Sequence, residues 1–410
     1  MDRSVRPIEG TKIGLIHFSN RYSFMILRTA ESEIKILAAQ FKAVAVVGPR
    51  QSGKTTLVRS VFGHKPYVNL ENPDIRRYAL EDPRGFLSNY PHGAILDEAQ
   101  RVPELFSYLQ QILDETATHG LFIITGSNNF LLQESISQSL AGRVGYLYLL
   151  PLSLEEIGDY ENNCNALLFK GGYPALYSEE TDPVKWYGNY ISTYVERDVR
   201  LLKNITDLVT FERFLRLCAG RIGQLLNMSS LAVEVGKDVK TIGSWISVLE
   251  TSFIVFRLQP YHENFNKRVV KMPKLYFYDT GLAIALLGVE NAGQLALHPF
   301  RGSLFENMIV LEFLKKRFNT GKSNNLFFWR DNVGNEIDLL LTIGNRKIPI
   351  EIKSGQTVTT DYLKGIQFWN KMTQTEGGFV VYGGDLMQNR SNGIRIVPYK
   401  EINKIVTDDV

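Results

Sequence analysis

The nine residues G-P-R-Q-S-G-K-T-T at positions 48–56 decide the fold of this chain. They match the pattern G-x-x-x-x-G-K-[ST], in which glycines let successive backbone N–H groups curl around phosphate oxygens at a helix N-terminus. Lys54 is expected to reach the β- and γ-phosphates of a nucleotide, and the Thr55 hydroxyl to bind a bridging magnesium ion. The predicted ATP-binding residues are Gly48, Pro49, Arg50, Gln51, Ser52, Gly53, Lys54, Thr55 and Thr56.

The context of this motif favours a phosphate-binding loop over a chance glycine-rich turn. An apolar run at residues 43–47 precedes the motif and predicts a buried strand, and residues 55–62 have the character of a helix. A strand, a glycine-rich loop and a helix in this order are typical of a P-loop nucleotide-binding domain.

Residues 94–98, A-I-L-D-E, predict an apolar strand that ends in two carboxylates. In an ATPase, Asp97 would hold the magnesium ion through water, and Glu98 would orient and activate the attacking water. A buried strand that ends in two solvated acids is also common by itself. The phosphate-binding loop upstream, with a predicted strand at residues 67–70 in between, favours the catalytic interpretation.

Two further candidates follow the next predicted strand, at residues 121–125. Asn128 is the first candidate for a side chain that contacts the γ-phosphate or the attacking water, and Ser127 is the second. A loop that only caps a helix is the alternative. Arg143 would bring positive charge to the phosphate in its own subunit or, in a homo-oligomer, in a neighbouring subunit. A surface salt bridge is an equally good interpretation of Arg143.

These segments alternate between strands and helices and predict an α/β fold over residues 25–158, with a parallel sheet and helices on both faces. A lead-in helix is expected within residues 25–40, where Ile34, Leu37 and Ala38 recur at helical spacing. Residues 1–24 are expected to be an extension with little structure.

The whole chain has 410 residues, enough for about three domains, and a net charge of only +3. This charge is too small to indicate nucleic-acid binding without a local basic patch. The two cysteines, Cys164 and Cys218, have no metal-ligand spacing and suit a reducing compartment. Because the apolar runs are short and the start of the chain lacks a secretory signal pattern, we expect a cytoplasmic protein without a membrane span.

Residues 159–285 are expected to hold a helical linker and a winged helix. The segments 229–236 and 239–250 give a helix-turn-helix pattern, and the segments 253–260 and 274–278 would form the wing. The turn and the second helix leave Lys237, Lys240, Thr241 and Ser244 outward. This arrangement suits phosphate contacts with duplex DNA, and it equally suits packing against protein.

Residues 286–410 carry a second group of charged residues. Asp338 lies in a predicted strand at residues 336–341, and Glu351 and Lys353 share one face of the next strand. Metal-assisted phosphodiester hydrolysis needs such a group, with magnesium on Asp338 and Glu351 and with Lys353 steadying the attacking water. Glu306, in a predicted helix at residues 303–318, would complete the metal ligands. The alternative is a solvated hairpin with alternating charged and apolar residues.

In combination, these stretches resemble one family over residues 25–383: the bacterial and archaeal AAA-type P-loop ATPases that join an ATPase domain, a winged helix and a C-terminal PD-(D/E)XK nuclease-like domain. The matching stretches are GPRQSGKTT, VNLENPD, AILDEAQRVPELFSYLQ, ITGSNNFLL, SQSLAGRV, LYFYDTGLA, GSLFENMIVLEF, NEIDLLL and IPIEIKSG.

The resemblance implies ATP and magnesium as cofactors, and a restriction-endonuclease-like fold for the last domain. The ATP and magnesium residues that it implies are Gly53, Lys54, Thr55, Asp97 and Glu98. The residues that match the nuclease-like motif are Glu306, Asp338, Glu351 and Lys353, although Ile337 replaces the leading proline of that motif.

Functions of different classes follow from these interpretations. The first is an ATPase that acts on DNA, with a magnesium-dependent nuclease site in its last domain. The alternative is an ATP-driven switch or regulatory module that binds DNA or protein through an inactive nuclease-like fold. A transcription regulator that uses ATP only for assembly is a third.

Overall fold

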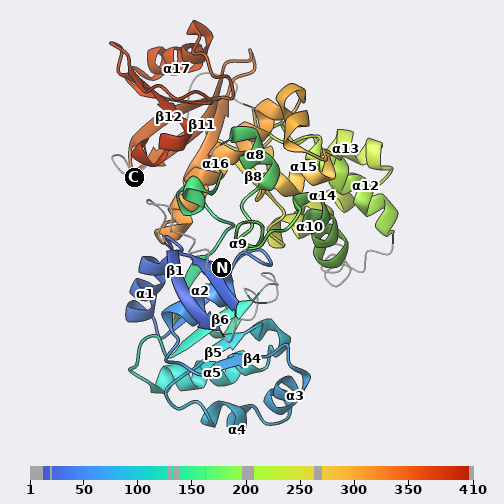
Figure 1. Ribbon diagram of the computed structural model, residues 1–410, viewed down its shortest axis with the longest axis vertical. Helices are drawn as coiled ribbons and strands as arrows, with labels where there is room; N and C mark the ends of the chain where they lie inside the picture. Colours follow the sequence, from blue (N-terminus) through green and yellow to red (C-terminus); the bar gives the residue numbers. More distant parts are fainter. Residues whose placement is uncertain are drawn as a thin grey trace, which may run out of the picture.

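The computed structural model describes residues 13–18, 21–126, 132, 136, 138–161, 163–195, 207–262 and 270–405, and for residues 13–18, 21–25, 194 and 195 the backbone alone. The described residues form an N-terminal lobe around one sheet, a helical part, and a C-terminal lobe around a second sheet (Figure 1). Within this part of the chain, no helix has both the length and the apolar composition that crossing a membrane requires.

The N-terminal sheet is parallel throughout, with the strand order β4-β5-β6-β3-β7. Its strands are β3 (Ala43–Val47), β4 (Tyr67–Asn69), β5 (Ile95–Asp97), β6 (Phe122–Gly126) and β7 (Val144–Tyr148). Its helices are α1 (Glu31–Gln40), α2 (Lys54–Val61), α3 (Pro73–Glu81), α4 (Pro83–Ser88) and α5 (Leu105–Glu115), and a 3₁₀ turn, η1 (Ala99–Arg101), follows β5.

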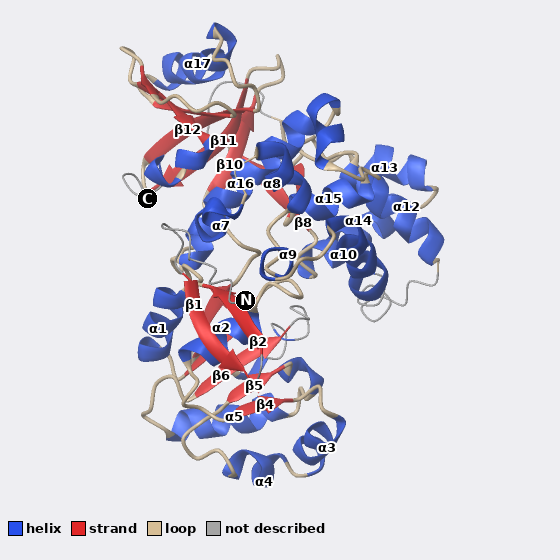
Figure 2. Ribbon diagram, in the orientation of Figure 1, coloured by secondary structure: helices blue, strands red, loops and turns tan. Residues whose placement is uncertain are grey.

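Both faces of this sheet are covered by helices, which is why its strands are continuous apolar runs. Val44 and Val46 of β3 belong to a core with side chains of α1 and α2. Ala45 and Val47 belong to a second core with side chains of α5. The predicted α/β fold with helices on both faces of a parallel sheet is therefore confirmed (Figure 2).

The start of the chain departs from the expectation of little structure within residues 1–24. The backbone of β1 (Ile13–Phe18) and β2 (Arg21–Ile26) forms an antiparallel hairpin. The alternation of polar and apolar residues in R-Y-S-F at positions 21–24 is typical of a strand and is the local reason for β2. Residues 1–12 lie outside the described part of the chain.

The helical part follows β7. Its elements are α7 (Leu154–Ile157), η2 (Gly158–Tyr160), α8 (Cys164–Lys170), α9 (Ala175–Ser178), α10 (Pro183–Tyr190), a π-helical turn (Ile191–Val195), α12 (Leu208–Ala219), α13 (Met228–Val235), α14 (Val239–Thr251), α15 (Thr280–Leu286) and η4 (Ala292–Leu297). Side chains of Asp207, Asn227, Asp238 and Asp279 accept hydrogen bonds from the first turns of α12 to α15, which fixes where these helices begin. The two helices of the predicted helix-turn-helix are present as α13 and α14.

The C-terminal sheet has eight strands in the order β14-β15-β13-β12-β11-β10-β8-β9. Its strands are β8 (Val255–Pro260), β9 (Lys274–Phe277), β10 (Leu326–Arg330), β11 (Glu336–Ile343), β12 (Arg346–Lys353), β13 (Gly378–Tyr382), β14 (Gln388–Asn389) and β15 (Ile394–Pro398). The helices beside it are α16 (Arg301–Asn319) and α17 (Lys364–Thr373), with 3₁₀ turns η5 (Thr360–Leu363) and η6 (Tyr399–Glu401).

The hairpin predicted as a wing is part of this second sheet. Strands β8 and β9 pair with each other, and β8 also pairs in parallel with β10 through Phe327 and Phe328. One hydrophobic core runs from Leu150 to Ile405 and includes side chains of β9, α16 and β11. The predicted boundary between residues 285 and 286 thus crosses a continuous core.

Candidate active site

The phosphate-binding loop connects β3 to α2 at the carboxyl edge of the parallel sheet. A Cβ atom on Gly48 would lie 2.2 Å from the carbonyl oxygen of Leu149, so only glycine fits this close approach. Gly53 has a φ of +91° directly before the first residue of α2, a conformation that side chains disfavour. The two glycines of the motif are therefore required by the backbone path.

Lys54 is buried at the start of α2 and is 6% exposed. Its Nζ donates hydrogen bonds to the carbonyl oxygens of Gly48, at 3.0 Å, and Pro49, at 2.6 Å. Burial lowers the pKa of Lys54 to about 8, although the carboxylates of Glu98 and Asp97 oppose this shift. The amine is thus held against the loop by two neutral carbonyl groups. A bound phosphate would supply the negative charge that these carbonyl groups lack.

The remaining loop residues line the same turn. Ser52 is fully buried, and its Oγ has no hydrogen-bond partner among the described residues. Gln51 has a φ of +59°, and Thr56 borders a pocket of about 350 Å³ together with Thr55. An orphaned buried hydroxyl in a glycine-rich loop fits a site that receives phosphate oxygens.

Asp97, at the end of β5, is held by three hydroxyl groups. Thr55 Oγ1 and Tyr67 Oη donate to Asp97 Oδ2, at 3.0 and 2.6 Å, and Thr125 Oγ1 donates to Oδ1. Burial, and then the bond to Asp97, raise the pKa of Tyr67, so the phenol keeps its proton. A hydroxyl and a carboxylate side by side are oxygen donors of the kind that Mg²⁺ prefers, and Thr55 and Asp97 fit a magnesium site.

Glu98 follows Asp97 with a φ of +56°, which is uncommon for a residue other than glycine. Such a conformation costs about 1–3 kcal/mol and is found most often at functional sites. Gln100 Nε2 donates to Glu98 Oε2 at 2.5 Å, and Gln100 Oε1 is buried without a partner among the described residues. The bond from Gln100 holds the carboxylate that is predicted to activate water.

Two predicted residues remain. Asn128, with Ser127, lies outside the described residues. Arg143 lies at the start of β7, at the amino edge of the sheet, and pairs with Asp114 through Nε and Nη2 at 2.5 and 2.9 Å. Since the phosphate-binding loop is at the carboxyl edge, the prediction that Arg143 reaches the phosphate in its own subunit is wrong. Arg143 instead forms a surface salt bridge with Asp114, which was the alternative interpretation.

Sequence reasoning missed Thr125, Tyr67, Gln100 and Arg28. Thr125 stands beside Asp97 because of strand register: Leu96 pairs with Ile124 one residue earlier, and the sequence alone does not give this register. Arg28 Nη1 donates to the carbonyl oxygen of Ser52 at 2.6 Å, and no local spacing in the sequence indicates this contact.

In the C-terminal sheet, the hairpin of β11 and β12 brings Asp338, Glu351 and Lys353 together. Lys353 Nζ lies 2.9 Å from Asp338 Oδ2 and 2.7 Å from Glu351 Oε2. Lys353 and Lys274 hold the pKa of Asp338 down to about 2 against the effect of burial, whereas burial and the charge of Asp338 raise the pKa of Glu351 well above its usual range. The pKa values of the two carboxyl groups are thus shifted in opposite directions.

Glu306 has different partners. It accepts hydrogen bonds from Lys274 Nζ at 2.8 Å and Tyr276 Oη at 2.5 Å, and Lys274 also lies 2.5 Å from Glu336 Oε1. Within the described ranges, no group of three or more His, Cys, Asp or Glu side chains is placed to hold a metal ion. The predicted magnesium ligands Glu306, Asp338 and Glu351 thus do not form a three-ligand site among the described residues.

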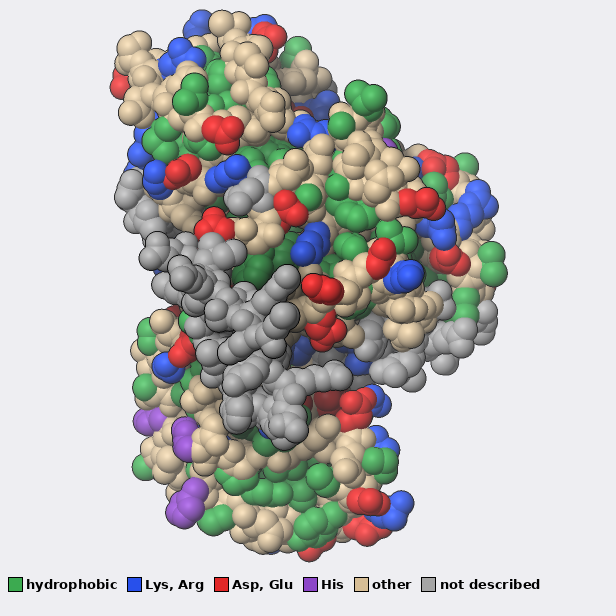
Figure 3. Space-filling model, in the orientation of Figure 1, with side chains coloured by type: hydrophobic (Ala, Val, Ile, Leu, Met, Phe, Trp, Pro, Cys, Tyr) green, Lys and Arg blue, Asp and Glu red, His purple; other side chains and the backbone are tan. Residues whose placement is uncertain are grey.

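The helix-turn-helix surface shows few basic side chains. Lys237 pairs with Asp207 at 3.0 Å, and the side chain of Lys240 is exposed on α14. On the face shown in Figure 3, basic and acidic side chains of the described residues are interspersed. This distribution agrees with the small net charge and does not single out a nucleic-acid surface.

Models of three protein families match the chain. A model described as AAA domain matches residues 40–158. Two models described as domains of unknown function, DUF8612 and DUF4143, match residues 161–293 and 301–402.

Curated relatives include uncharacterized proteins of Mycobacterium tuberculosis and Mycobacterium bovis. Each is 32% identical over 343 residues, which cover 82% of this chain and 76% of the relative. An uncharacterized protein of Haemophilus influenzae is 22% identical over 214 residues, with 48% of this chain and 52% of that protein covered.

Among solved structures, the Walker-type ATPase PABY2304 of Pyrococcus abyssi is 14% identical with a TM-score of 0.44, and covers 64% of this chain and 96% of its own. AMPPCP-bound DnaA from Aquifex aeolicus is 13% identical with a TM-score of 0.28, and covers 54% of this chain and 85% of its own.

Proposed function

Because this chain belongs to the same family as the two mycobacterial proteins and contains an AAA-type P-loop domain, we propose that it hydrolyses ATP to drive a conformational switch. The observation that carries this proposal is the convergence of Lys54, Thr55, Asp97 and Glu98 at the carboxyl edge of one parallel sheet, with Thr55 Oγ1 3.0 Å from Asp97 Oδ2. This edge is where ligands bind in open α/β sheets.

Each of these residues has one part in hydrolysis. Lys54 would exchange the two loop carbonyls for β- and γ-phosphate oxygens, and the loop N–H groups would bind the remaining phosphate charge. Thr55 and Asp97 would hold Mg²⁺, which when bound neutralises charge on the phosphates. Glu98 would accept the proton of the attacking water, and Gln100 keeps its carboxylate in place.

The test compares ATP binding and hydrolysis by the wild-type protein, Lys54→Ala and Lys35→Ala. Lys35 is an exposed lysine of α1 that pairs only with Glu31 among the interactions described for it, at 2.7 Å, and serves as the matched control. We expect Lys54→Ala to lower hydrolysis by at least about 100-fold and Lys35→Ala to leave it unchanged. Hydrolysis by Lys54→Ala at the wild-type rate would reject the assignment.

We infer that the C-terminal charged centre is a fixed cluster rather than a magnesium-dependent nuclease site. The support is the pairing of Glu306 with Lys274, and of Asp338 and Glu351 with Lys353, at distances of 2.7 to 2.9 Å. Ammonium groups in these positions compensate the carboxylates without a metal. The nuclease-like fold would then serve as a binding or signalling module.

Action on DNA is a second candidate. The support is the succession of α13, α14 and the β8–β9 hairpin, which has the order of a winged helix, and the exposed Lys240 on α14. Binding of a fluorescent duplex at several salt concentrations tests it. Phosphate contacts predict that Lys240→Glu weakens binding and reduces its salt dependence, while binding that is unaltered in Lys240→Glu would remove α14 as the contact.

A further inference from the structure

Arg28 joins three separate segments through one buried guanidinium group. Its Nη1 donates to Ser52 O in the phosphate-binding loop at 2.6 Å, and its Nη2 donates to Leu150 O at 2.7 Å. Its Nε donates to Glu156 Oε1 at 3.1 Å. The rigid fork of donors in arginine suits such a three-way contact, which the single ammonium group of a lysine does not reproduce.

The contact with Ser52 fixes a peptide plane of the phosphate-binding loop. Ser52 C=O and Gly53 N–H belong to the same planar trans peptide unit, so they point in opposite directions. With the carbonyl held by Arg28, the N–H of Gly53 points away from Arg28, and the loop cannot turn this peptide without losing a buried hydrogen bond. Arg28 therefore orients the N–H of Gly53, a backbone donor of the proposed phosphate site, through the carbonyl group on the opposite side of the same peptide unit.

Glu156 is the partner that keeps Arg28 in place. Its Oε1 accepts from Thr29 N at 2.7 Å and Thr29 Oγ1 at 3.0 Å, and its Oε2 accepts from Ser153 N at 2.9 Å. Although burial alone would raise the pKa of Glu156, the charge of Arg28 and the backbone donors lower it below its ordinary value. The pair is therefore ionised and fully hydrogen-bonded.

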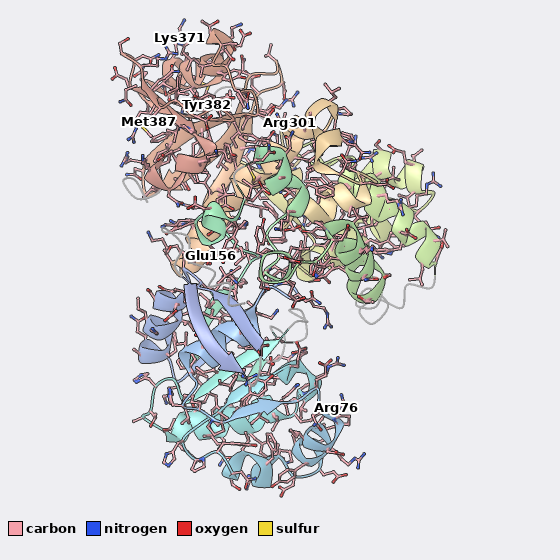
Figure 4. All side chains as sticks on the ribbon, viewed as in Figure 1. Arg76, Glu156, Arg301, Lys371, Tyr382 and Met387 are labelled. Carbon is pink, nitrogen blue, oxygen red and sulfur yellow. The ribbon has the colours of Figure 1, made fainter. Side chains whose placement is uncertain are left out.

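The same segments are tied to α16, on the C-terminal side. Asn319 Nδ2 donates to Thr29 Oγ1 at 2.7 Å, and Leu154 N donates to Glu312 Oε2 at 2.8 Å. Lys315 Nζ donates to Leu152 O at 2.7 Å. Figure 4 places Glu156 between the N-terminal sheet and α16.

Helix α16 reaches from this junction to the C-terminal charged centre. It has 19 residues and is about 28 Å long at 1.5 Å per residue. Its other end carries Glu306, and Asn307 binds both Phe277 N, at 2.7 Å, and Phe277 O, at 2.9 Å, on β9. One helix thus contacts Thr29 and Leu154, which neighbour Arg28 and Glu156 in the sequence, and also contributes Glu306 to the charged centre.

We propose that Arg28 is a positioning residue of the phosphate-binding loop, and that the Arg28–Glu156 pair couples the nucleotide state of this loop to α16. This inference rests on the proposed ATP binding. A nucleotide that fixes the loop also fixes Ser52 O, and with it Arg28, Glu156 and Thr29. A change in this set alters the contacts of Asn319 and Glu312, so α16 responds to nucleotide.

Hydrogen exchange with and without the non-hydrolysable analogue AMP-PNP tests the coupling in the full-length protein. In the wild type, we expect slower exchange in the loop, residues 48–56, and in the last turns of α16, residues 312–319. Asn319→Ala removes one of the three hydrogen bonds to α16 and keeps the Arg28–Glu156 pair, so it should retain loop protection and lose part of the protection in α16. In Glu156→Gln, we expect AMP-PNP not to slow hydrogen exchange in residues 312–319 of α16.

The positioning role is tested by steady-state kinetics. Arg28→Lys keeps the charge but not the fork, so we expect KM for ATP to rise at least tenfold, with a smaller change in kcat. Glu212→Gln, in an exposed ion pair with Arg216, is the matched control and should leave KM and the exchange of α16 unchanged.

The outcomes separate the two proposals. Loop protection in the wild type without any response of α16, or a full response of α16 in both Asn319→Ala and Glu156→Gln, would overturn the coupling alone. A wild-type KM in Arg28→Lys would overturn the positioning role. If AMP-PNP does not slow exchange in the loop of the wild-type protein, the proposed ATP binding is rejected. The proposed coupling rests on ATP binding and is then rejected as well.

Discussion

Lys274 on β9 and Glu306 on α16 form a buried ion pair, with 2.8 Å between Nζ and Oε1. The same ammonium group lies 2.5 Å from Glu336 Oε1 on β11. A lysine from the predicted wing therefore enters the charged centre of the C-terminal sheet. Glu306 is thus paired with Lys274, whereas Asp338 and Glu351 are paired with Lys353.

Replacing Lys274 by Met is expected to destabilise the C-terminal lobe by about 3–5 kcal/mol, because Glu306 and Glu336 would lose a buried counter-ion. Tryptophan fluorescence during urea unfolding measures this selectively, since the four tryptophans, Trp186, Trp245, Trp329 and Trp369, all lie outside the N-terminal lobe. The exposed Lys35→Met change is the control.

The double change Lys274→Met with Glu306→Gln should recover part of the lost stability, because it also removes one of the unpaired carboxylates. An unchanged urea midpoint in Lys274→Met would contradict the role of Lys274 as a buried counter-ion.

Magnesium-dependent nicking of a supercoiled plasmid checks the inference that the C-terminal centre is not a nuclease. We expect the wild-type protein to nick no more than Asp338→Ala does, with and without ATP, since lysines compensate the carboxylates. Nicking by the wild type that disappears in Asp338→Ala would show instead that the carboxylates bind a catalytic metal.

Thr125→Val is expected to reduce ATP hydrolysis by about 10- to 100-fold while ATP binding stays nearly constant. The change removes a hydroxyl that orients Asp97, and losses of this size are usual for residues that orient metal ligands. Phosphate release and equilibrium ATP binding are the two measurements, with Thr118→Val in an exposed turn as the control. Equal hydrolysis rates for Thr125→Val and the wild type would exclude a role for the Thr125 hydroxyl.

ATP affinity is expected to fall as pH rises above about 8, the pKa of Lys54 in the free protein. Below this pH the amine is already charged. Above it, ATP must draw a proton onto Lys54, so affinity falls by up to about tenfold per pH unit until the raised pKa of the complex is reached. Calorimetry at pH 9 in two buffers of different ionisation enthalpy measures this uptake, and Lys54→Arg, which stays charged, should show none. Equal affinity at pH 7 and pH 9 would contradict the shift.

The sequence was sufficient for the parts of the fold that depend on local pattern. The phosphate-binding loop needs glycine at positions 48 and 53, and together with this loop the apolar strand that ends in Asp97 and Glu98 indicated an ATPase site. Periodicity likewise located α13, α14 and the strands that bring Asp338, Glu351 and Lys353 together.

Contacts between distant segments could not be predicted in the same way. Arg28 and Glu156 are 128 positions apart, and Lys274 and Glu306 are 32 apart, with no spacing that links either pair. The contact of Thr125 with Asp97 depends on the register between β5 and β6. The pairing of β8 with β10 joins the β8–β9 hairpin to a strand that follows it in the sequence only after the long helix α16. Arg143 was misplaced because its distance in sequence from the loop does not show which edge of the sheet it occupies.

The most direct test of the central claim is phosphate release from ATP by the wild-type protein and by Glu98→Gln, combined with ATP binding by both. We predict magnesium-dependent release by the wild type, a loss of about 10²- to 10⁴-fold in Glu98→Gln, and retained ATP binding in that variant. Release at equal rates, or ATP that binds to neither protein, would contradict the account.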